Sequence, residues 1–309
     1  MQARYVDRYP FVSVLVPVFN DGGRLKLCLD ALEHQTYPRN LYEVVVIDNG
    51  SSEDVECIVN AFEQALICFE SAPGSYAARN KGISLAKGEI IAFTDADCIP
   101  SDVWIKEGIS KFLDTSNCGL IAGRIELFFK DALRPTAVEV YESIEMGFSQ
   151  NILLEEQQYA LTANLFTSKD IIEAVGSFNG ALKSGGDCEW GQRVFAAGYN
   201  QVYAPNALVK HPARSSLWQL YKRVTRINGG YFDKKKATVS RLDRIRGLIK
   251  DLILALTPPF RSVFHIWSKE ERLSTSTQKI QFILVMLFVR YVGAWERIRL
   301  RLGGSSRRW

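Results

Sequence analysis

The chain has 309 residues, 47% of them hydrophobic and 23% charged, which is typical of a globular protein and excludes a disordered or fibrous chain. Its net charge of +4 hides an asymmetry: residues 206–309 hold 22 Lys and Arg against 6 Asp and Glu, whereas residues 1–205 hold 16 against 28. The acidic part is typical of a metal-using enzyme domain, and the basic part indicates an anionic surface such as a membrane or nucleic acid.

The first 115 residues alternate between strand and helix patterns. Near-continuous apolar runs predict strands that are buried on both faces, at residues 11–18, 43–47 and 90–94. Apolar residues at helical spacing predict helices between them, at about 25–32, 55–62 and 76–86. This alternation predicts βαβ units and a mostly parallel sheet.

Polar residues stand where these strands end. Asn20 follows the first strand, Asp48 the second, and Asp95 the third. Ligands of parallel sheets bind beyond the carboxyl ends of the strands, so we expect a binding site at this edge. In Asp95-Ala96-Asp97 two carboxylates lie one residue apart, which favours a hard divalent cation such as Mg²⁺ or Mn²⁺ over the alternative of a solvated turn.

Known nucleotide motifs narrow the class of enzyme. No G-x-G-x-x-G follows the first strand, which disfavours a nicotinamide enzyme, and no G-x-x-x-x-G-K-[ST] is present, which disfavours a P-loop enzyme. Asp48 can accept hydrogen bonds from a ribose or base, or it can cap a turn; the residue alone does not decide between these roles.

The rest of the chain is less regular until the basic region. Short strands are predicted at 120–126 and 160–167. An apolar helical stripe from Ile245 to Leu256 ends at Pro258-Pro259, and a last apolar stretch over 280–295 contains Arg290 and is too short and polar for a membrane span. This basic amphipathic region predicts contact with an anionic membrane surface; the alternative is packing on the catalytic domain or in a dimer. Nucleic acid is not expected, because no binding motif accompanies the charge.

Several blocks together resemble family 2 glycosyltransferases. They are Val-Leu-Val-Pro-Val-Phe-Asn at 14–20, Val-Val-Val-Ile-Asp-Asn-Gly-Ser-Ser at 44–52, Ala-Arg-Asn-Lys-Gly-Ile at 78–83 and Phe-Thr-Asp-Ala-Asp at 93–97. Residues 185–193 resemble the Glu-Asp-x-Asp-Leu-Gly-x-Arg block of that family, with Gly186 in place of the usual Glu and with Asp187, Gly191 and Arg193 matching. The resemblance covers roughly residues 11–230.

The resemblance implies an α/β fold of the GT-A type, with a Rossmann-like, mostly parallel central sheet flanked by helices and a basic helical C-terminal extension. The expected domains are a catalytic domain over 1–238 and the extension over 239–309. Within the catalytic domain, 11–115 is the expected nucleotide-sugar half and 116–238 the expected acceptor half.

The resemblance also implies roles for single residues. It implies that the donor nucleotide is held by Pro17, Phe19, Asn20, Asp48, Asn49, Arg79, Asn80 and Asp95. The divalent cation, Mn²⁺ or Mg²⁺, would be held by Asp95, Asp97 and His211, although a histidine after a strand is often structural. Asp187 would be the catalytic base; its alternative role is to cap a helix.

The function implied is an inverting, metal-dependent glycosyltransferase. It would move a sugar from a nucleotide-diphosphate sugar to a hydroxyl of a glycan or lipid-linked glycan in envelope or extracellular polysaccharide synthesis. The alternatives are a polyprenyl-phosphate glycosyltransferase and a non-catalytic scaffold that binds nucleotide-sugars. Six scattered cysteines without a C-x-x-C pair and an N-terminus without an apolar signal core predict a cytoplasmic protein, peripheral on the cytoplasmic face of the membrane.

Overall fold

The computed structural model describes residues 9–145, 149–236 and 241–308. Contacts between residues divide the chain into two units: the first unit comprises 1–128, 148–181 and 186–212, and the second comprises 129–147, 182–185 and 213–309. The sequence predicts a boundary at 238, whereas the contacts also assign 129–147, 182–185 and the residues from 213 onward to the second unit. The reason is that α9 (Leu217–Lys236) and α5 (Ala137–Glu145) pack on α12 (Ser276–Arg301).

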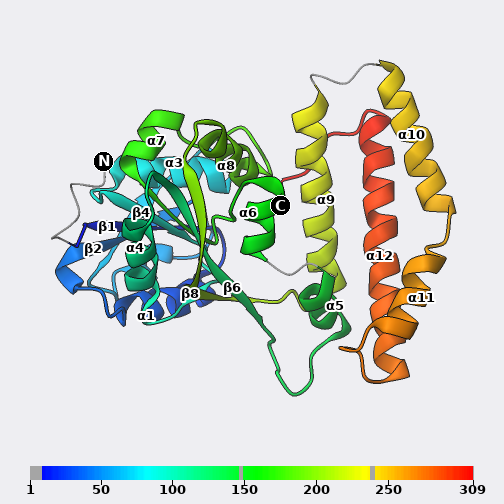
Figure 1. Cartoon of the computed structure of the whole chain (residues 1–309), viewed down its shortest axis with the longest axis horizontal. Coiled ribbons are helices and arrows are strands. Elements are labelled where there is room, and N and C mark those ends of the chain that lie inside the picture. The colour runs from blue at the N-terminus through cyan, green and yellow to red at the C-terminus, as the bar shows by residue number, and fades with distance from the viewer. Residues whose placement is uncertain (1–8, 146–148, 237–240, 309) are drawn as a thin grey trace. The chain divides into compact units, whose positions relative to one another are not determined.

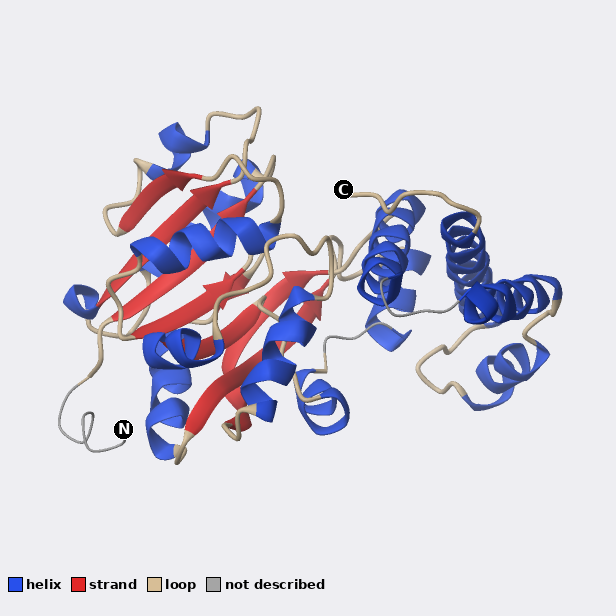
Figure 2. Ribbon diagram, turned by 90° about the horizontal axis from the view of Figure 1, so that it is seen from above, coloured by secondary structure: helices blue, strands red, loops and turns tan. Residues whose placement is uncertain are grey.

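The first unit is built on one eight-stranded sheet with the order β3-β2-β1-β4-β7-β6-β8-β5 (Figures 1 and 2). The strands are β1 (Val12–Val18), β2 (Tyr42–Asp48), β3 (Ala65–Phe69), β4 (Ile90–Thr94), β5 (Ile99–Pro100), β6 (Cys118–Phe128), β7 (Asn164–Ser168) and β8 (Asn200–Pro212). The first four strands in the order are parallel, as is the pair β6 and β8, while β7 and β5 run antiparallel to their neighbours. The predicted mostly parallel sheet is therefore confirmed.

Helices flank this sheet (Figure 2). They are α1 (Gly22–Glu33), α2 (Val55–Val59), α3 (Ser75–Leu85), α4 (Trp104–Asp114), α6 (Gln150–Gln157), α7 (Lys169–Val175) and α8 (Gly186–Ala196), with a 3₁₀ turn at Arg39–Leu41. The apolar spacing that predicts α1 is the face it buries, since Leu25, Cys28 and Leu32 are inaccessible to solvent. The three predicted helices are present in order, although α2 ends at Val59, before Phe62.

Two strand predictions need correction. The edge strand β3, which pairs in parallel with β2, was not expected, although all five of its residues are apolar. The strand expected over 160–167 begins only at Asn164. The reason is a buried side chain: the Gln150 amide accepts from the Leu161 backbone N–H at 2.7 Å and donates to the Leu161 carbonyl at 3.2 Å, which holds that residue out of the strand.

A buried amide ties the middle of the sheet together. Asn164 Oδ1 accepts from the Trp104 indole N–H at 2.8 Å, and its Nδ2 donates to the carbonyls of Arg124 and Ala207, both at 2.8 Å. One side chain therefore joins α4, β6, β7 and β8. The Asn164 side chain is inaccessible to solvent, so water does not replace these hydrogen bonds.

Replacing this amide is expected to destabilise the first unit. Asn164→Leu leaves one indole N–H and two carbonyls without this partner, at about 1–3 kcal/mol for each buried group left unsatisfied. We therefore expect the free energy of unfolding, measured in urea, to fall by about 3 kcal/mol or more. The control is Asn200→Ala, whose exposed amide donates to the Ser116 carbonyl at 2.6 Å. Equal stability of the two variants would contradict the structural role of Asn164.

The second unit is helical, with α5, α9, α12, α10 (Arg241–Leu256) and α11 (Phe260–Lys269). Figure 1 shows α12 between α9 and α10. The first turn of α12 is fixed by a capping box, in which Thr275 accepts from the Gln278 backbone and the Gln278 side chain accepts from the Thr275 backbone. Among the residues described, no helix is both long enough and apolar enough to cross a membrane.

Candidate active site

The carboxyl ends of β1, β2 and β4 lie at one edge of the sheet, as predicted. Val18 pairs with Asp48, and Leu15 pairs with Phe93, so the residues that follow these strands come together. Asn20 has a φ of 50°, a left-handed conformation that asparagine tolerates better than most residues. Its Oδ1 accepts from the Ser52 backbone N–H at 2.7 Å, which joins the loops after β1 and β2.

The expected nucleotide residues shape this edge through contacts with the backbone. Buried Asp48 accepts from the Ser51 N–H at 2.9 Å. Asn49 Nδ2 donates to the carbonyls of Glu70 and Ala72, both at 2.8 Å, and its Oδ1 accepts from the Gly74 N–H at 2.6 Å. Asn49 therefore holds the loops after β2 and β3 together, and its contact with a nucleotide stays a prediction.

Two further residues that are expected to bind the nucleotide, Pro17 and Phe19, lie at the end of β1. Pro17 lies in β1, paired with Ile47. Phe19, the next residue but one, is 57% exposed, although its side chain is large and apolar. An exposed aromatic ring beside the strand ends is a surface on which a planar base can stack.

Helix α3 brings a buried cation to the carboxylates. Arg79 is 3% exposed and its Nη2 lies 2.5 Å from Asp95 Oδ1, so the guanidinium fixes the first carboxylate of the Asp-x-Asp pair. Asn80, the next residue, exchanges two hydrogen bonds with the backbone of Phe178, at 2.8 and 3.0 Å. In this structure Asn80 therefore positions the loop that leads to α8.

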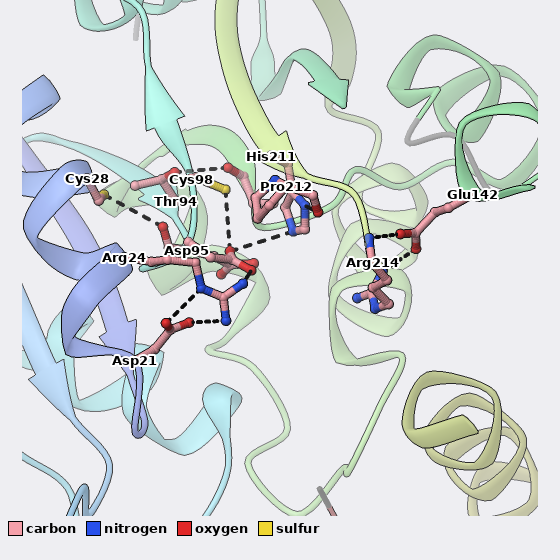
Figure 3. Close-up of polar contacts among 12 residues, drawn as sticks. Asp21, Arg24, Cys28, Thr94, Asp95, Cys98, Glu142, His211, Pro212 and Arg214 are labelled. Carbon is pink, nitrogen blue, oxygen red and sulfur yellow. Dashed lines mark hydrogen bonds and ion pairs between the residues drawn. The ribbon is translucent and has the colours of Figure 1, made fainter. Parts of the chain in front are cut away.

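The second carboxylate lies beside the predicted histidine. Strand β5 pairs with β8, with Ile99 opposite Lys210, which places the residues just before β5 next to His211. Asp97 Oδ1 is 3.6 Å from His211 Nε2, and ligand atoms of Asp97, Cys98 and His211 all lie within 4.8 Å of one another. Figure 3 shows His211 of β8 meeting the loop after β4 that carries Asp95 and Cys98.

The donor set fits a divalent cation. His211 Nδ1 is 2.9 Å from the Pro212 carbonyl oxygen, which carries no proton, so in the neutral ring Nδ1 must hold the hydrogen. Nε2 then turns its lone pair toward the Asp97 carboxylate, and two acceptors face one another. Such an arrangement suits a cation bound between them, and an imidazole with carboxylates is a ligand set that Mn²⁺ accepts.

A second cation approaches Asp97 from α1. Arg24 makes two contacts of 2.7 Å with Asp21 (Figure 3), and its Nη1 lies 3.5 Å from Asp97 Oδ2. The positive charge of Arg24 offsets the negative charge of Asp97. Neither Arg24 nor Asp21 belongs to a sequence motif, so the sequence alone did not point to them.

The predicted base lies at the start of α8. Asp187 Oδ1 accepts from the Tyr76 hydroxyl at 3.2 Å and from the Cys188 backbone N–H at 3.0 Å, so it also makes a cap-type contact with its own helix. A Cβ on Gly186 would lie 2.7 Å from the Tyr76 ring. The ring therefore occupies the space of the Glu that the family usually has here. Tyr76 was missed by sequence reasoning, although it stands one helical turn before Arg79.

The environment of Asp187 changes its acidity. Burial raises the pKa of this carboxyl above its ordinary value of 3.8, while the nearby Arg79 guanidinium and the hydrogen bonds act in the opposite direction. The same burial raises the pKa of the Tyr76 hydroxyl, which therefore stays protonated as a donor. A carboxyl with a raised pKa is a better proton acceptor than an ordinary one.

This shift predicts the pH dependence of turnover. A base must be ionised, so kcat/KM should fall as the pH drops through the raised pKa of Asp187, at a pH above that expected for an ordinary aspartate. The measurement is a pH profile of kcat/KM under saturating metal. In the Tyr76→Phe variant the carboxylate loses one donor, so the acid limb should move to still higher pH; an unmoved limb would contradict the assignment to Asp187.

Comparison with known proteins identifies the family. A family model described as glycosyl transferase family 2 matches residues 13–174. The chain belongs to glycosyl transferase family 2. Glycosyltransferase AglE of Haloferax volcanii is 38% identical to this glycosyltransferase over 242 residues, which cover 76% of each chain. The family predicted from the ordered blocks is therefore confirmed.

Two more distant relatives span most of this family 2 chain. A dolichyl N-acetyl-alpha-D-glucosaminyl phosphate 3-beta-D-2,3-diacetamido-2,3-dideoxy-beta-D-glucuronosyltransferase from Methanococcus voltae is 22% identical over 225 residues, 69% of this chain and 70% of the relative. The solved structure of mannosyltransferase PcManGT from Pyrobaculum calidifontis, in complex with GDP-Man and Mn²⁺, aligns with a TM-score of 0.61 at 17% identity. That alignment covers 94% of this chain and 88% of the other and confirms the predicted fold.

Proposed function

We propose that this family 2 glycosyltransferase is an inverting enzyme that moves a sugar from a nucleotide-diphosphate sugar to a hydroxyl of a glycan or lipid-linked glycan, in envelope or extracellular polysaccharide synthesis. The observation that carries the proposal is the placement of Asp95 and Asp97 at the end of β4 with Asp187 in the first turn of α8. Arg79 connects the two groups, since it pairs with Asp95 and its charge acts on Asp187.

The transfer itself is assigned to Asp187. Its carboxylate takes the proton of the acceptor hydroxyl while the oxygen attacks the anomeric carbon on the face opposite the diphosphate. The nucleoside diphosphate leaves with the bonding electrons. The proposed reaction uses one base and forms no covalent intermediate with the enzyme, so it is a single displacement, which inverts the anomeric configuration.

Other residues bind and orient the donor. Asp97 and His211 would hold the divalent cation, with Asp95 beside them. Arg24 lies close to the Asp97 carboxylate. A bound Mn²⁺ or Mg²⁺ would neutralise the charge on the leaving diphosphate. The residues after β1 and β2, including Asp48 and exposed Phe19, would receive the ribose and base.

A relative and the charge of the C-terminal part support the proposed acceptor and place of action. The Methanococcus relative is named for an acceptor in which a sugar is carried on dolichyl phosphate. The basic C-terminal part suits the membrane in which such a lipid resides. We therefore place the enzyme peripherally on the cytoplasmic face, with an anionic membrane surface as its partner.

The test is a thermal-shift screen against UDP, GDP, CDP and dTDP, each with and without Mn²⁺. GDP is the first candidate, because the Pyrobaculum structure holds GDP-Man and Mn²⁺. One nucleotide should raise the unfolding temperature only when Mn²⁺ is present, since a ligand that binds the folded state stabilises it. No rise with any nucleotide would reject the donor site and favour the scaffold alternative.

The product then distinguishes the remaining possibilities. With the matching nucleotide-sugar, NMR of the product should show an inverted anomeric centre, and retention would contradict the single displacement. Transfer to a lipid phosphate in place of a sugar hydroxyl would favour the polyprenyl-phosphate alternative.

A further inference from the structure

Helix α10 turns its apolar side to solvent. Six large apolar residues on it are exposed by 43–82%: Leu242, Ile245, Ile249, Leu252, Ile253 and Leu256. At about 100° per residue they fall within a sector of roughly 100°, so they form one continuous stripe along the helix. A stripe of this width normally faces the core of a water-soluble protein.

The opposite side of α10 carries the inward contact, and it is charged. Asp251 is 5% exposed, and its two oxygens receive Arg297 Nε at 2.7 Å and Arg301 Nε at 2.8 Å, both from α12. A charge-paired side therefore packs against α12, while the apolar side is left outside. Water disfavours this orientation, because reversing the helix would remove the stripe from solvent.

Helix α11 continues the pattern after Pro258-Pro259. Phe260 is 75% exposed, Phe264 70% and Trp267 49%, at spacings of four and three that place them on one side of the helix. Ile266 faces the other way and is buried in the core of the second unit. We call the nine exposed residues of α10 and α11 the outer stripe.

Exposed basic side chains flank the outer stripe. They are Arg246 and Lys250 on α10 and Arg261 on α11. The exposed acid on α10 is Asp243, which lies 3.7 Å from Arg246. A helix with an apolar stripe, aromatic residues and basic flanks is the kind that lies in the plane of a membrane interface.

We propose that the outer stripe is the surface by which this enzyme lies on an anionic lipid bilayer, with the nine side chains in the headgroup and acyl boundary and the basic flanks on lipid phosphates. The inference rests on the membrane-surface partner of the proposed function and gives it a location. Charge selects this partner over a second copy of the chain. Residues 206–309 carry 22 basic against 6 acidic residues, so two such surfaces repel one another, whereas anionic lipid attracts them.

The test is flotation of the full chain with vesicles of phosphatidylcholine, alone or mixed with phosphatidylglycerol. The test variant is Leu256→Ser/Phe260→Ser/Phe264→Ser, all three on the outer stripe. The control is Leu27→Ser/Leu66→Ser/Phe195→Ser, which removes three large apolar side chains that are 49–55% exposed from the first unit. All six positions are solvent-exposed, so both variants should keep the far-UV circular dichroism of the parent chain.

We expect the parent chain and the control to float with the mixed vesicles and to release as salt is raised. The partitioning of the test variant into vesicles should fall by about tenfold or more, because three apolar side chains that the bilayer would bury are removed. Equal flotation of both variants, or no flotation of the parent chain, would overturn the proposal. A parent chain that is dimeric, with a test variant that is monomeric, would also overturn the proposal, since the stripe would then be an interface between copies.

The nucleotide and Mn²⁺ screen, run on the same samples without vesicles, keeps the two proposals separate. A thermal shift that persists in the test variant while flotation is lost supports the outer stripe and leaves the donor site intact. Normal flotation without any nucleotide-dependent shift would instead reject the donor site alone.

Discussion

Asp187→Asn should abolish glycosyl transfer while leaving donor binding nearly unchanged. The amide keeps the shape of the side chain and can still accept from the Tyr76 hydroxyl and the Cys188 N–H, but it cannot take a proton from the acceptor. Loss of a positioned base typically costs 10²–10⁴-fold, so we expect kcat to fall by about that factor. The measurement is kcat with the identified donor, together with the nucleotide-dependent thermal shift.

The stability of Asp187→Asn distinguishes loss of the base from misfolding. Because burial raises the pKa of Asp187, ionisation of this group opposes folding, and the cost is present at pH values above the raised pKa. A neutral amide removes that cost, so Asp187→Asn should be at least as stable as the parent chain at pH 7. If the variant lost activity through misfolding, it would be less stable than the parent chain at pH 7.

The matched control is Glu189→Gln, two residues further along α8. Glu189 pairs with Arg193 at 2.8 Å, a contact between partly exposed groups whose loss costs about 0.3–0.5 kcal/mol. Its kcat should stay within a few-fold of the parent value. If Asp187→Asn also retains more than a tenth of the parent kcat, Asp187 is not the base, and its contacts with Tyr76 and Cys188 are structural.

Asp97→Ala should remove the Mn²⁺-dependent part of nucleotide binding. Asp97 is the carboxylate that faces His211 Nε2 at 3.6 Å, so its loss removes one of the two side chains expected to hold the cation. At a nucleotide concentration of about 100 Kd, bound ligand stabilises the fold by about 2.7 kcal/mol, and most of this should vanish in the variant. The measurement is the unfolding temperature with nucleotide, with and without Mn²⁺.

The stability of Asp97→Ala without ligand is expected to change little. Arg24 keeps its two contacts of 2.7 Å with Asp21, so no buried cation is left unpaired. The control is Asp30→Ala, an exposed carboxylate on α1, which should keep the full nucleotide response. A Mn²⁺-dependent shift that survives in Asp97→Ala would place the cation elsewhere and leave His211 with a structural role.

Local pattern determined the nucleotide half of the fold. Continuous apolar runs predicted β1, β2 and β4, and helical spacing predicted the helices between them, because a buried parallel strand and an amphipathic helix each leave a direct mark on the sequence. The rule that ligands bind beyond the carboxyl ends of parallel strands then placed Asn20, Asp48 and Asp95 at one edge. The short strand β3 was not predicted, although its five residues are all apolar, and the late start of β7 at Asn164 depends on a buried side chain from another segment.

Tertiary structure alone decided the contacts between distant segments. His211 meets Asp97 because β5 pairs with β8, and Asp187 receives the Tyr76 hydroxyl across 111 residues of sequence.

Tertiary structure also decided the orientation of α10. The sequence showed an apolar stripe but not which side of the helix would pack, since hydrophobic spacing gives the width of a face and not its partner. Asp251 of α10 forms ion pairs with Arg297 and Arg301 of α12, so the charged side of α10 packs inward and the apolar stripe faces outward.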